Sequence, residues 1–123
     1  MLQHQERLHD CDVRLVALAQ QVGRQRDVVV VFGARTVAQE VAAIASGHSH
    51  VTDPLDSKHV IDLPQRPLAL AVDLGPVPLD WKDIPAFAQL AHDVKAAAVG
   101  LGLAITWGGD WGWDYDHYEL RDP

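Results

Sequence analysis

The chain has 123 residues, which is enough for one compact domain and too few for two. Hydrophobic residues make up 48% and charged residues 22%, the mixture of a folded globular protein rather than of a disordered chain. The formal charge is −7, from 10 basic and 17 acidic residues, and no basic stripe is present, so we expect no nucleic-acid partner. The single cysteine, Cys11, excludes an internal disulfide framework and Cys-rich zinc sites.

Apolar runs in the sequence are short. The longest are residues 28–32 and small blocks near residues 68–72 and 96–99, whereas a membrane span needs roughly 20 apolar residues, so we expect no membrane partner. The N-terminal stretch MLQHQERLHD lacks the apolar core of a secretory signal, and we expect synthesis in a cytoplasm. No repeat or flexible linker divides the chain, which predicts a single domain over residues 1–123.

The first half of the chain predicts a helix, a strand and a second helix. Apolar residues recur at helical spacing over residues 10–22, and Gly23 can end this helix. The β-branched run 28–32 (VVVVF) predicts a buried strand. Thr36 is a good cap for a helix extending to about residue 46, whose expected apolar face is Val37, Val41 and Ile44.

The second half begins with a long segment, residues 47–67, that has no periodicity and reads as a functional loop. An apolar strand is expected over 68–74, followed by a helix from 83 or 84 to about 99 with Pro85 in its first turn. Gly100 and Gly102 are expected to end this helix. Two further strands are expected, over 103–107 and 115–120. This mixed order of helices and strands predicts the α+β class.

Seven histidines are available as catalytic or metal-binding groups. His4, His9 and His92 read as surface or packing residues, whereas His48 and His50 could share a metal ion if the loop is extended. His59 and His117 have carboxylates nearby, and two imidazoles with one carboxylate form a common catalytic zinc set. The residues alone leave two interpretations open, a metal site or histidines that are hydrogen-bonded in a polar cleft.

Four short motifs together resemble a known family. They are SKH (57–59), AVDL (71–74), WGGDW (107–111) and DYDHYEL (114–120), and the segment FGART (32–36) also fits. The pattern resembles the LAS-type zinc peptidases of family M15, most closely the bacteriophage endolysins that are L-alanyl-D-glutamate peptidases, with D-alanyl-D-alanine carboxypeptidases and dipeptidases as cousins. The resemblance covers residues 28–120. It implies a Hedgehog/DD-peptidase-like fold, in which a small antiparallel sheet is flanked by helices.

The resemblance also implies a site and the role of each residue in it. The zinc ligands are expected to be His59, Asp73 and His117. Asp114, three residues before His117, takes the position of the general base, and Arg35 that of the residue that holds the substrate carbonyl or the oxyanion. Ser57 matches a serine that shapes the loop or binds substrate. The tryptophans of the WGGDW segment are expected to pack against the floor of the site.

Two features of the sequence depart from the family pattern or leave a choice. His59 and Asp73 are fourteen positions apart, twice the family spacing, so residues 60–70 contain an insertion and Asp62 competes with Asp73 as the ligand. Asp73 is preferred because it keeps the context of a strand end. Asp116 competes with Asp114 as the base, and the spacing of three residues before His117 favours Asp114.

The function that this resemblance implies is zinc-dependent hydrolysis of the peptidoglycan stem peptide, causing lysis of a bacterial host. The expected enzyme is a monomeric catalytic domain without a separate wall-binding domain. It is made in the host cytoplasm and acts at the cell wall or periplasm after release through a holin. The alternatives are a D-alanyl-D-alanine carboxypeptidase or dipeptidase, and a non-catalytic wall-binding or interaction domain of the same fold.

Overall fold

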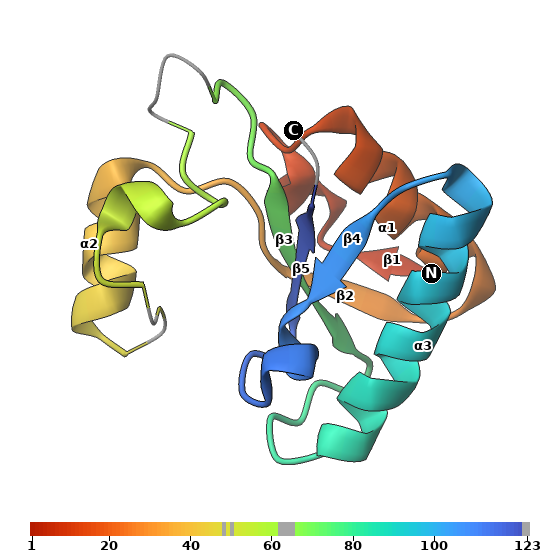
Figure 1. Ribbon diagram of the computed structural model, residues 1–123. Coiled ribbons are helices and arrows are strands. Elements are labelled where there is room, and N and C mark those ends of the chain that lie inside the picture. Colours follow the sequence, from red (N-terminus) through yellow and green to blue (C-terminus); the bar gives the residue numbers. More distant parts are fainter. Residues whose placement is uncertain (48, 50, 62–65, 122–123) are drawn as a thin grey trace.

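The computed structural model describes residues 1–47, 49, 51–61 and 66–121. Its centre is a mixed β-sheet (Figure 1). Within these residues five strands pair in the order β1-β2-β3-β5-β4. The pair β1–β2 is parallel and the other pairs are antiparallel. The strands are β1 (Leu2–Gln3), β2 (Val28–Phe32), β3 (Ala71–Pro76), β4 (Ile105–Trp107) and β5 (His117–Leu120). The predicted α+β class and the largely antiparallel sheet are confirmed.

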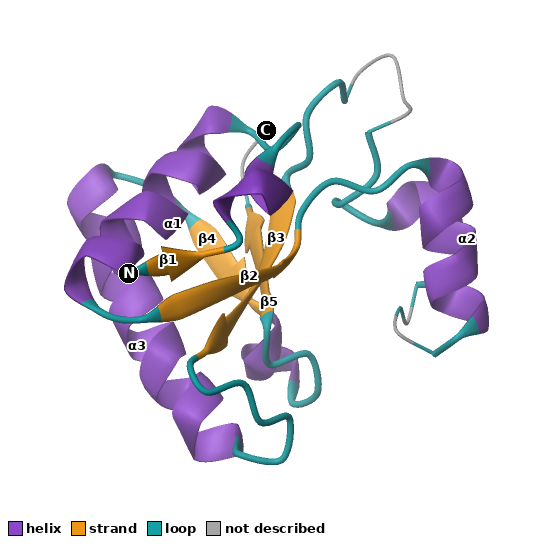
Figure 2. Cartoon of the chain, turned by 180° about the vertical axis from the view of Figure 1, so that it is seen from behind, coloured by secondary structure: helices purple, strands orange, loops and turns teal. Residues whose placement is uncertain are grey.

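Two long helices cover one face of the sheet and pack against each other, α1 (Val13–Gln25) and α3 (Ile84–Leu101). The shorter helix α2 (Val37–Ala45) lies away from them, next to the 3₁₀ helix η2 (Pro54–Asp56), as Figure 2 shows from behind. Two further 3₁₀ helices are η1 (Gln5–Leu8) and η3 (Gly108–Trp111). No helix in the described ranges combines the length and apolar character that crossing a membrane requires.

The alternation of side chains along the central strands separates the core from a polar face. Val72 and Leu74 of β3, with Tyr118 of β5, belong to the buried cluster under the helices. Because successive side chains of a strand point to opposite faces, Asp73 and His117 point away from that cluster. The open face of the sheet therefore carries the ionisable groups.

Two helix predictions need correction. Gly23 does not end α1 but lies inside it, where a Cβ atom would come within 2.7 Å of the Leu2 Cβ, so the glycine allows β1 to pack against the helix. The expected apolar face of α2 is not buried, since Val41 is 50% exposed, and the side chain of this helix that is buried is Glu40. The capping of α2 by Thr36 is confirmed, with Gln39 completing the capping box.

Strand boundaries differ from those predicted by a few residues, and one irregularity matters for the site. The run Val28–Phe32 is a strand as predicted, whereas β1 was not expected. The pairing of β2 with β3 shifts between Val30 and Phe32, because Val31 is an additional residue in β2. Such a bulge changes the face to which the next side chain points. Phe32 is therefore paired with Asp73, on the open face, instead of continuing the buried side of β2.

Candidate active site

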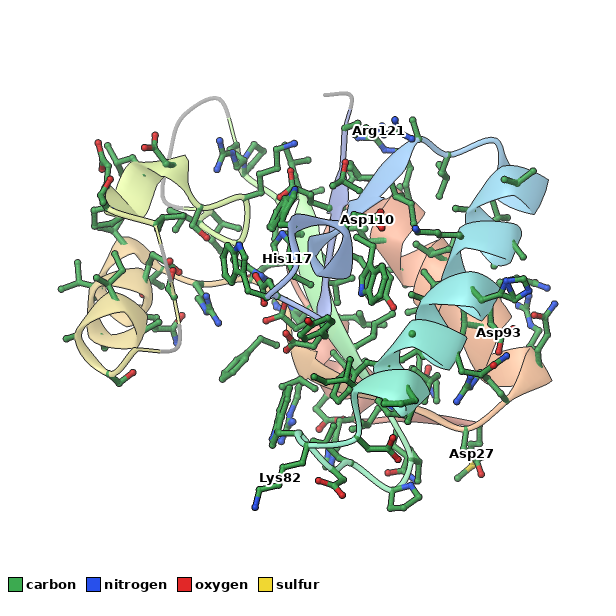
Figure 3. The ribbon with its side chains drawn as sticks, turned by 60° about the horizontal axis from the view of Figure 1, so that its bottom comes forward. Asp27, Lys82, Asp93, Asp110, His117 and Arg121 are labelled. Carbon is green, nitrogen blue, oxygen red and sulfur yellow. The ribbon has the colours of Figure 1, made fainter. Side chains whose placement is uncertain are left out.

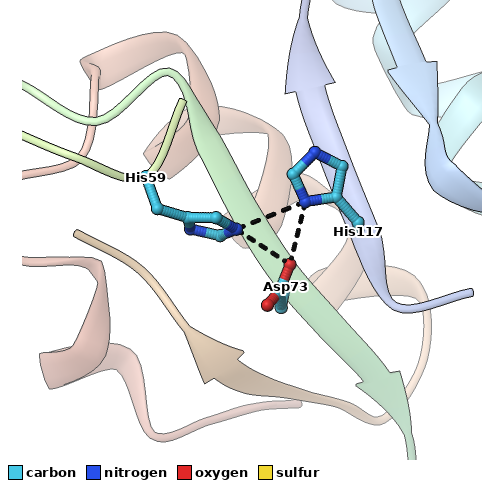
Figure 4. A group of neighbouring side chains, drawn as sticks. All are labelled: His59, Asp73 and His117. Carbon is cyan, nitrogen blue, oxygen red and sulfur yellow. Dashed lines mark hydrogen bonds and ion pairs between the residues drawn. The ribbon is translucent and has the colours of Figure 1, made fainter. Parts of the chain in front are cut away.

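Three buried side chains converge on the open face of the sheet (Figure 4). The Nε2 atom of His59 lies 3.1 Å from Oδ1 of Asp73 and 3.3 Å from Nδ1 of His117, which is itself 3.3 Å from the same carboxylate oxygen. The three residues are only 3%, 6% and 7% exposed. One ligand-type atom from each therefore faces a common point, as in a metal-binding group.

Backbone pairing explains how residues far apart in sequence meet. Asp73 and His117 are directly paired across β3 and β5, so their side chains emerge side by side on one face. His59 lies in the loop after η2, where its carbonyl accepts a hydrogen bond of 2.7 Å from the Arg35 amide. The chain returns to the same place after the insertion, because the Leu70 amide donates to the Lys58 carbonyl at 2.8 Å. The insertion thus leaves Asp73 beside His59.

The outer nitrogen of each imidazole has a fixed partner. Nδ1 of His59 lies 2.7 Å from the carbonyl oxygen of Gly33, which can only accept a hydrogen bond, so Nδ1 carries the proton. Nε2 of His117 lies 2.8 Å from a carboxylate oxygen of Glu119 and donates to it. These partners leave Nε2 of His59 and Nδ1 of His117 as the lone-pair atoms that face Asp73.

A second carboxylate contact extends this arrangement. The other carboxylate oxygen of Glu119 lies 2.9 Å from Nζ of Lys58, which also donates to the Leu120 carbonyl at 2.6 Å. Burial opposes the charge of Glu119, but the hydrogen bonds from His117 and Lys58 outweigh it, and the pKa of Glu119 is lowered. Glu119 is thus an ionised acceptor that holds the His117 ring.

The three converging atoms need a positive charge among them. With neutral rings, two lone pairs and a carboxylate oxygen would face one another at hydrogen-bond distance without a donor. Burial lowers the pKa of His117, but hydrogen bonds to Asp73 and Glu119 outweigh it and raise that pKa to about 10. Burial also opposes ionisation of Asp73, but the charges and hydrogen bonds of His59 and His117 hold its pKa below the usual range. The site therefore stabilises a cation, either a proton on His117 or a metal ion that replaces it.

Asp114 reaches the same site from a tight turn. Its carboxylate lies 3.9 Å from Nδ1 of His117, whose amide donates to the Asp114 carbonyl at 3.2 Å. Gly108 is required here, because a Cβ atom at that position would meet the Asp114 carbonyl oxygen at 2.2 Å. Burial raises the pKa of Asp114 more than the nearby His117 lowers it. The competing residue, Asp116, lies beside Asp114 and lines an adjoining cavity, and burial together with the charges of Asp73 and Asp114 raises its pKa to about 9.

Arg35 lies at the edge of the site and is held by a buried carboxylate. Its Nη1 atom donates to Glu40 at 2.9 Å, and its Nη2 atom lies 3.8 Å from the second oxygen of Asp73. Glu40 is fully buried on α2 and also accepts a hydrogen bond from Ser49. The guanidinium group further lies 4.7 Å above the ring of Phe32. Arg35 thereby connects α2 to the ligand group.

A cleft opens over the converging atoms, with a hollow of about 80 Å³. One wall comes from the loop segments next to α2, including Val51 and Asp56, and the other from the turn after β4. Figure 3 shows His117 between these two parts of the molecule. Trp111 lies in the second wall at 44% exposure with its ring 5.4 Å from that of His117, so it lines the cleft instead of packing in its floor as expected.

All six residues singled out as site candidates line or support this cleft. Besides the residues above, Ser57 is buried, and its hydroxyl accepts a hydrogen bond from the His59 amide at 3.3 Å. The competing candidates Asp62, His48 and His50 lie outside the described residues. Sequence reasoning missed the supporting residues Lys58, Glu119 and Glu40. The alternation of His117 and Glu119 on one face of a strand could have revealed Glu119, whereas nothing in an apolar helix signalled the role of Glu40.

Comparison with known proteins agrees with this geometry. Residues 2–122 match the family model described as phage L-alanyl-D-glutamate peptidase. The chain is 33% identical over 96 residues to the L-alanyl-D-glutamate peptidase of Escherichia phage T5, a match that covers 76% of this chain and 65% of that protein, just under two thirds of its length. The crystal structure of Serratia marcescens L-Ala D-Glu endopeptidase ChiX superposes with a TM-score of 0.77 at 25% identity, covering 98% of this chain and 90% of that one. The chain belongs to the family of phage L-alanyl-D-glutamate peptidases.

Proposed function

We propose that the protein is a zinc-dependent peptidase that hydrolyses the bond between L-alanine and D-glutamate in the stem peptide of peptidoglycan. The observation that carries this proposal is the convergence of His59, Asp73 and His117. The ring protons of the two histidines point away from the common centre, toward Gly33 and Glu119. Membership of the peptidase family supports the choice of reaction, and the names of the two relatives support the choice of bond.

The donor set fits zinc. Two imidazole nitrogens and one carboxylate oxygen are ligands that zinc prefers, and three protein ligands are typical of catalytic rather than structural zinc sites. When bound, zinc supplies Lewis-acid chemistry, making water nucleophilic near neutral pH and polarising a carbonyl group. The hollow of about 80 Å³ over the ligand atoms offers room for reacting groups.

Asp114 is the residue that we propose as general base. Its carboxylate faces the ligand group from 3.9 Å, and its raised pKa makes it a better proton acceptor than an ordinary aspartate. It takes a proton from the attacking water and passes it to the amine that leaves as the peptide bond breaks. The turn held open by Gly108 sets its position.

Arg35 is proposed to hold the substrate carbonyl or the oxyanion that develops from it. Its guanidinium group is always charged, and Glu40 fixes one of its nitrogens so that the others can face the cleft. Ser57 is proposed to shape the loop that carries His59, because its hydroxyl accepts a hydrogen bond from the His59 amide.

The proposed ligands, base and arginine come from one chain, so we propose that residues 1–123 act as one monomeric catalytic domain. The proposed place of action is the bacterial cell wall, reached from the host cytoplasm through a holin-type pore. Size-exclusion chromatography of the active protein tests the monomeric state, and an active dimer would overturn it.

The reaction is tested by digesting purified peptidoglycan with zinc-loaded protein and identifying the new termini by mass spectrometry. Cleavage should expose the amino group of glutamate and the carboxyl group of alanine, stop with a chelator and resume with zinc. His59→Ala should be inactive, whereas His92→Ala, which changes an exposed histidine of α3, should remain active. Release of terminal D-alanine instead would favour the carboxypeptidase alternative, and an absence of cleavage would overturn the proposal.

A further inference from the structure

The insertion ends in contact with residues 57–59, which we name the ligand loop because it ends on a proposed zinc ligand. The Nη1 atom of Arg66 donates a hydrogen bond of 2.6 Å to the carbonyl oxygen of Ser57. The Leu70 amide donates one of 2.8 Å to the Lys58 carbonyl. Two contacts from the end of the insertion thus hold the two residues that precede the ligand.

The chain after Arg66 is anchored to other parts of the fold. The Ala69 amide donates to the Asp10 carbonyl at 2.8 Å, and the Asp12 amide donates to the Ala69 carbonyl at 2.9 Å. Ala69 is buried, and β3 begins two residues later at Ala71. Arg66 therefore reaches the ligand loop from a segment that the N-terminal part of the chain and the sheet hold in place.

The position of His59 depends on Ser57. The Ser57 hydroxyl accepts a hydrogen bond of 3.3 Å from the His59 amide, and the Ser57 carbonyl accepts one of 3.2 Å from the Val60 amide. The contact from Arg66 to that carbonyl is shorter, and it is charge-assisted because a guanidinium group is always charged. Such hydrogen bonds are about twice as strong as those between neutral groups. Removing Arg66 thus weakens the hold on the residue that orients the His59 backbone.

We propose that Arg66 is a positioning residue for the metal site. It fixes the backbone of Ser57, and through Ser57 it keeps Nε2 of His59 directed at Asp73. This role gives the insertion a function, since Arg66 lies within it. The inference rests on the proposed function, because zinc is the metal proposed there. Outer partners of metal ligands typically change metal affinity about 10- to 100-fold, and we expect about tenfold here because Arg66 acts through a neighbouring residue.

The test compares the zinc Kd of wild-type protein and three variants by competition with a chelating indicator. Arg66→Ala should bind zinc about tenfold more weakly. Arg66→Lys keeps a charged donor and should stay within about threefold of wild type. The matched control is Arg26→Ala, which removes a partly buried arginine bonded to Asp93 at 2.8 Å. Asp93 lies on α3, apart from His117 in Figure 3, so this variant should keep the wild-type Kd.

A measurement without metal separates positioning from a general loss of stability. In the zinc-free protein, Arg66→Ala should speed hydrogen exchange of the His59 and Val60 amides, which both donate to Ser57, and leave amides in the middle of α3 unchanged. Arg26→Ala should leave the exchange of the His59 and Val60 amides unchanged. Denaturant titration shows whether each variant folds, and Arg66→Gln takes the place of Arg66→Ala if that variant does not.

The outcomes separate this inference from the proposed function. A zinc Kd of Arg66→Ala within about twofold of wild type would overturn the positioning role while the peptidase function stands. An equal loss of zinc affinity in Arg26→Ala, or in Arg66→Lys, would also overturn it. If the wild-type protein binds no zinc, the proposed function fails and the inference fails with it.

Discussion

Replacing Glu119 with alanine removes the carboxylate that orients His117. In the structure this carboxylate accepts the Nε2 proton of His117 at 2.8 Å and an ammonium proton of Lys58 at 2.9 Å. Without it, the His117 ring is free to carry its proton on Nδ1, the atom that faces Asp73 and is proposed to bind zinc. We therefore expect Glu119→Ala to fold and to bind zinc more weakly.

The size of the loss follows from the contact that is removed. A hydrogen bond to a charged group contributes about 1.5–3 kcal/mol. Removing the carboxylate partner of a metal-binding histidine typically weakens metal binding about 10- to 100-fold, which corresponds to a similar free energy. Glu119 is 17% exposed at its side chain, so solvent screens the contact only weakly. Glu119→Gln keeps an oxygen acceptor for Nε2 and should lose less than about tenfold.

Zinc affinity is measured by competition with a chelating indicator, and the protonated nitrogen of His117 by nitrogen chemical shifts in NMR spectra. The matched control is Asp110→Asn, which removes an exposed carboxylate paired with Lys95 at 3.0 Å. Zinc affinity of Glu119→Ala within twofold of wild type, or no lower than that of Asp110→Asn, would refute the orienting role of Glu119.

Three further predictions concern the base, the metal and stability. Asp114→Asn should keep its zinc but lose about a hundredfold or more in kcat, and turnover above a tenth of wild type would count against Asp114 as the base. Because zinc must displace the proton of His117, whose pKa is about 10, the zinc Kd should fall about tenfold per pH unit between pH 7 and 9, and a constant Kd would contradict this. The raised pKa of His117 also stabilises the folded protein when zinc has been removed with a chelator. This contribution should be complete below about pH 6.5, the pKa of histidine in the unfolded chain, and should be lost as the pH rises to about 10, which denaturant titrations would detect.

The elements that the sequence predicts best are those with a strong local cause. The β-branched run Val28–Phe32 forms a strand over its full length, and Thr36 caps α2 through the expected box with Gln39. Gly23 misled the prediction because it has a packing role, contact with Leu2, that local propensity cannot reveal. The strand β1 has two residues, which pair with β2 and pack against Gly23, and so short a strand leaves no recognisable pattern in the local sequence.

The candidate site was predictable through its motifs and not through spacing alone. Asp73 and His117 meet because β3 and β5 pair in one register, which depends on the whole sheet. The position of the chain after the insertion also depends on a tertiary contact, the hydrogen bond from the Leu70 amide to the Lys58 carbonyl. The alternation of side chains along a strand likewise could not predict the bulge that turns Phe32 toward Asp73. A single extra residue moves the side chains that follow it to the other face of the sheet.

The most direct test of the account is the zinc content of the purified protein and its ligand variants. Wild-type protein dialysed against a trace of zinc should hold one zinc ion per chain by elemental analysis, and His59→Ala, Asp73→Ala and His117→Ala should each hold almost none, because three protein ligands leave no substitute. Asp62→Ala should keep the full complement. Stoichiometric zinc in Asp73→Ala, or its loss in Asp62→Ala, would contradict the assignment of the metal site.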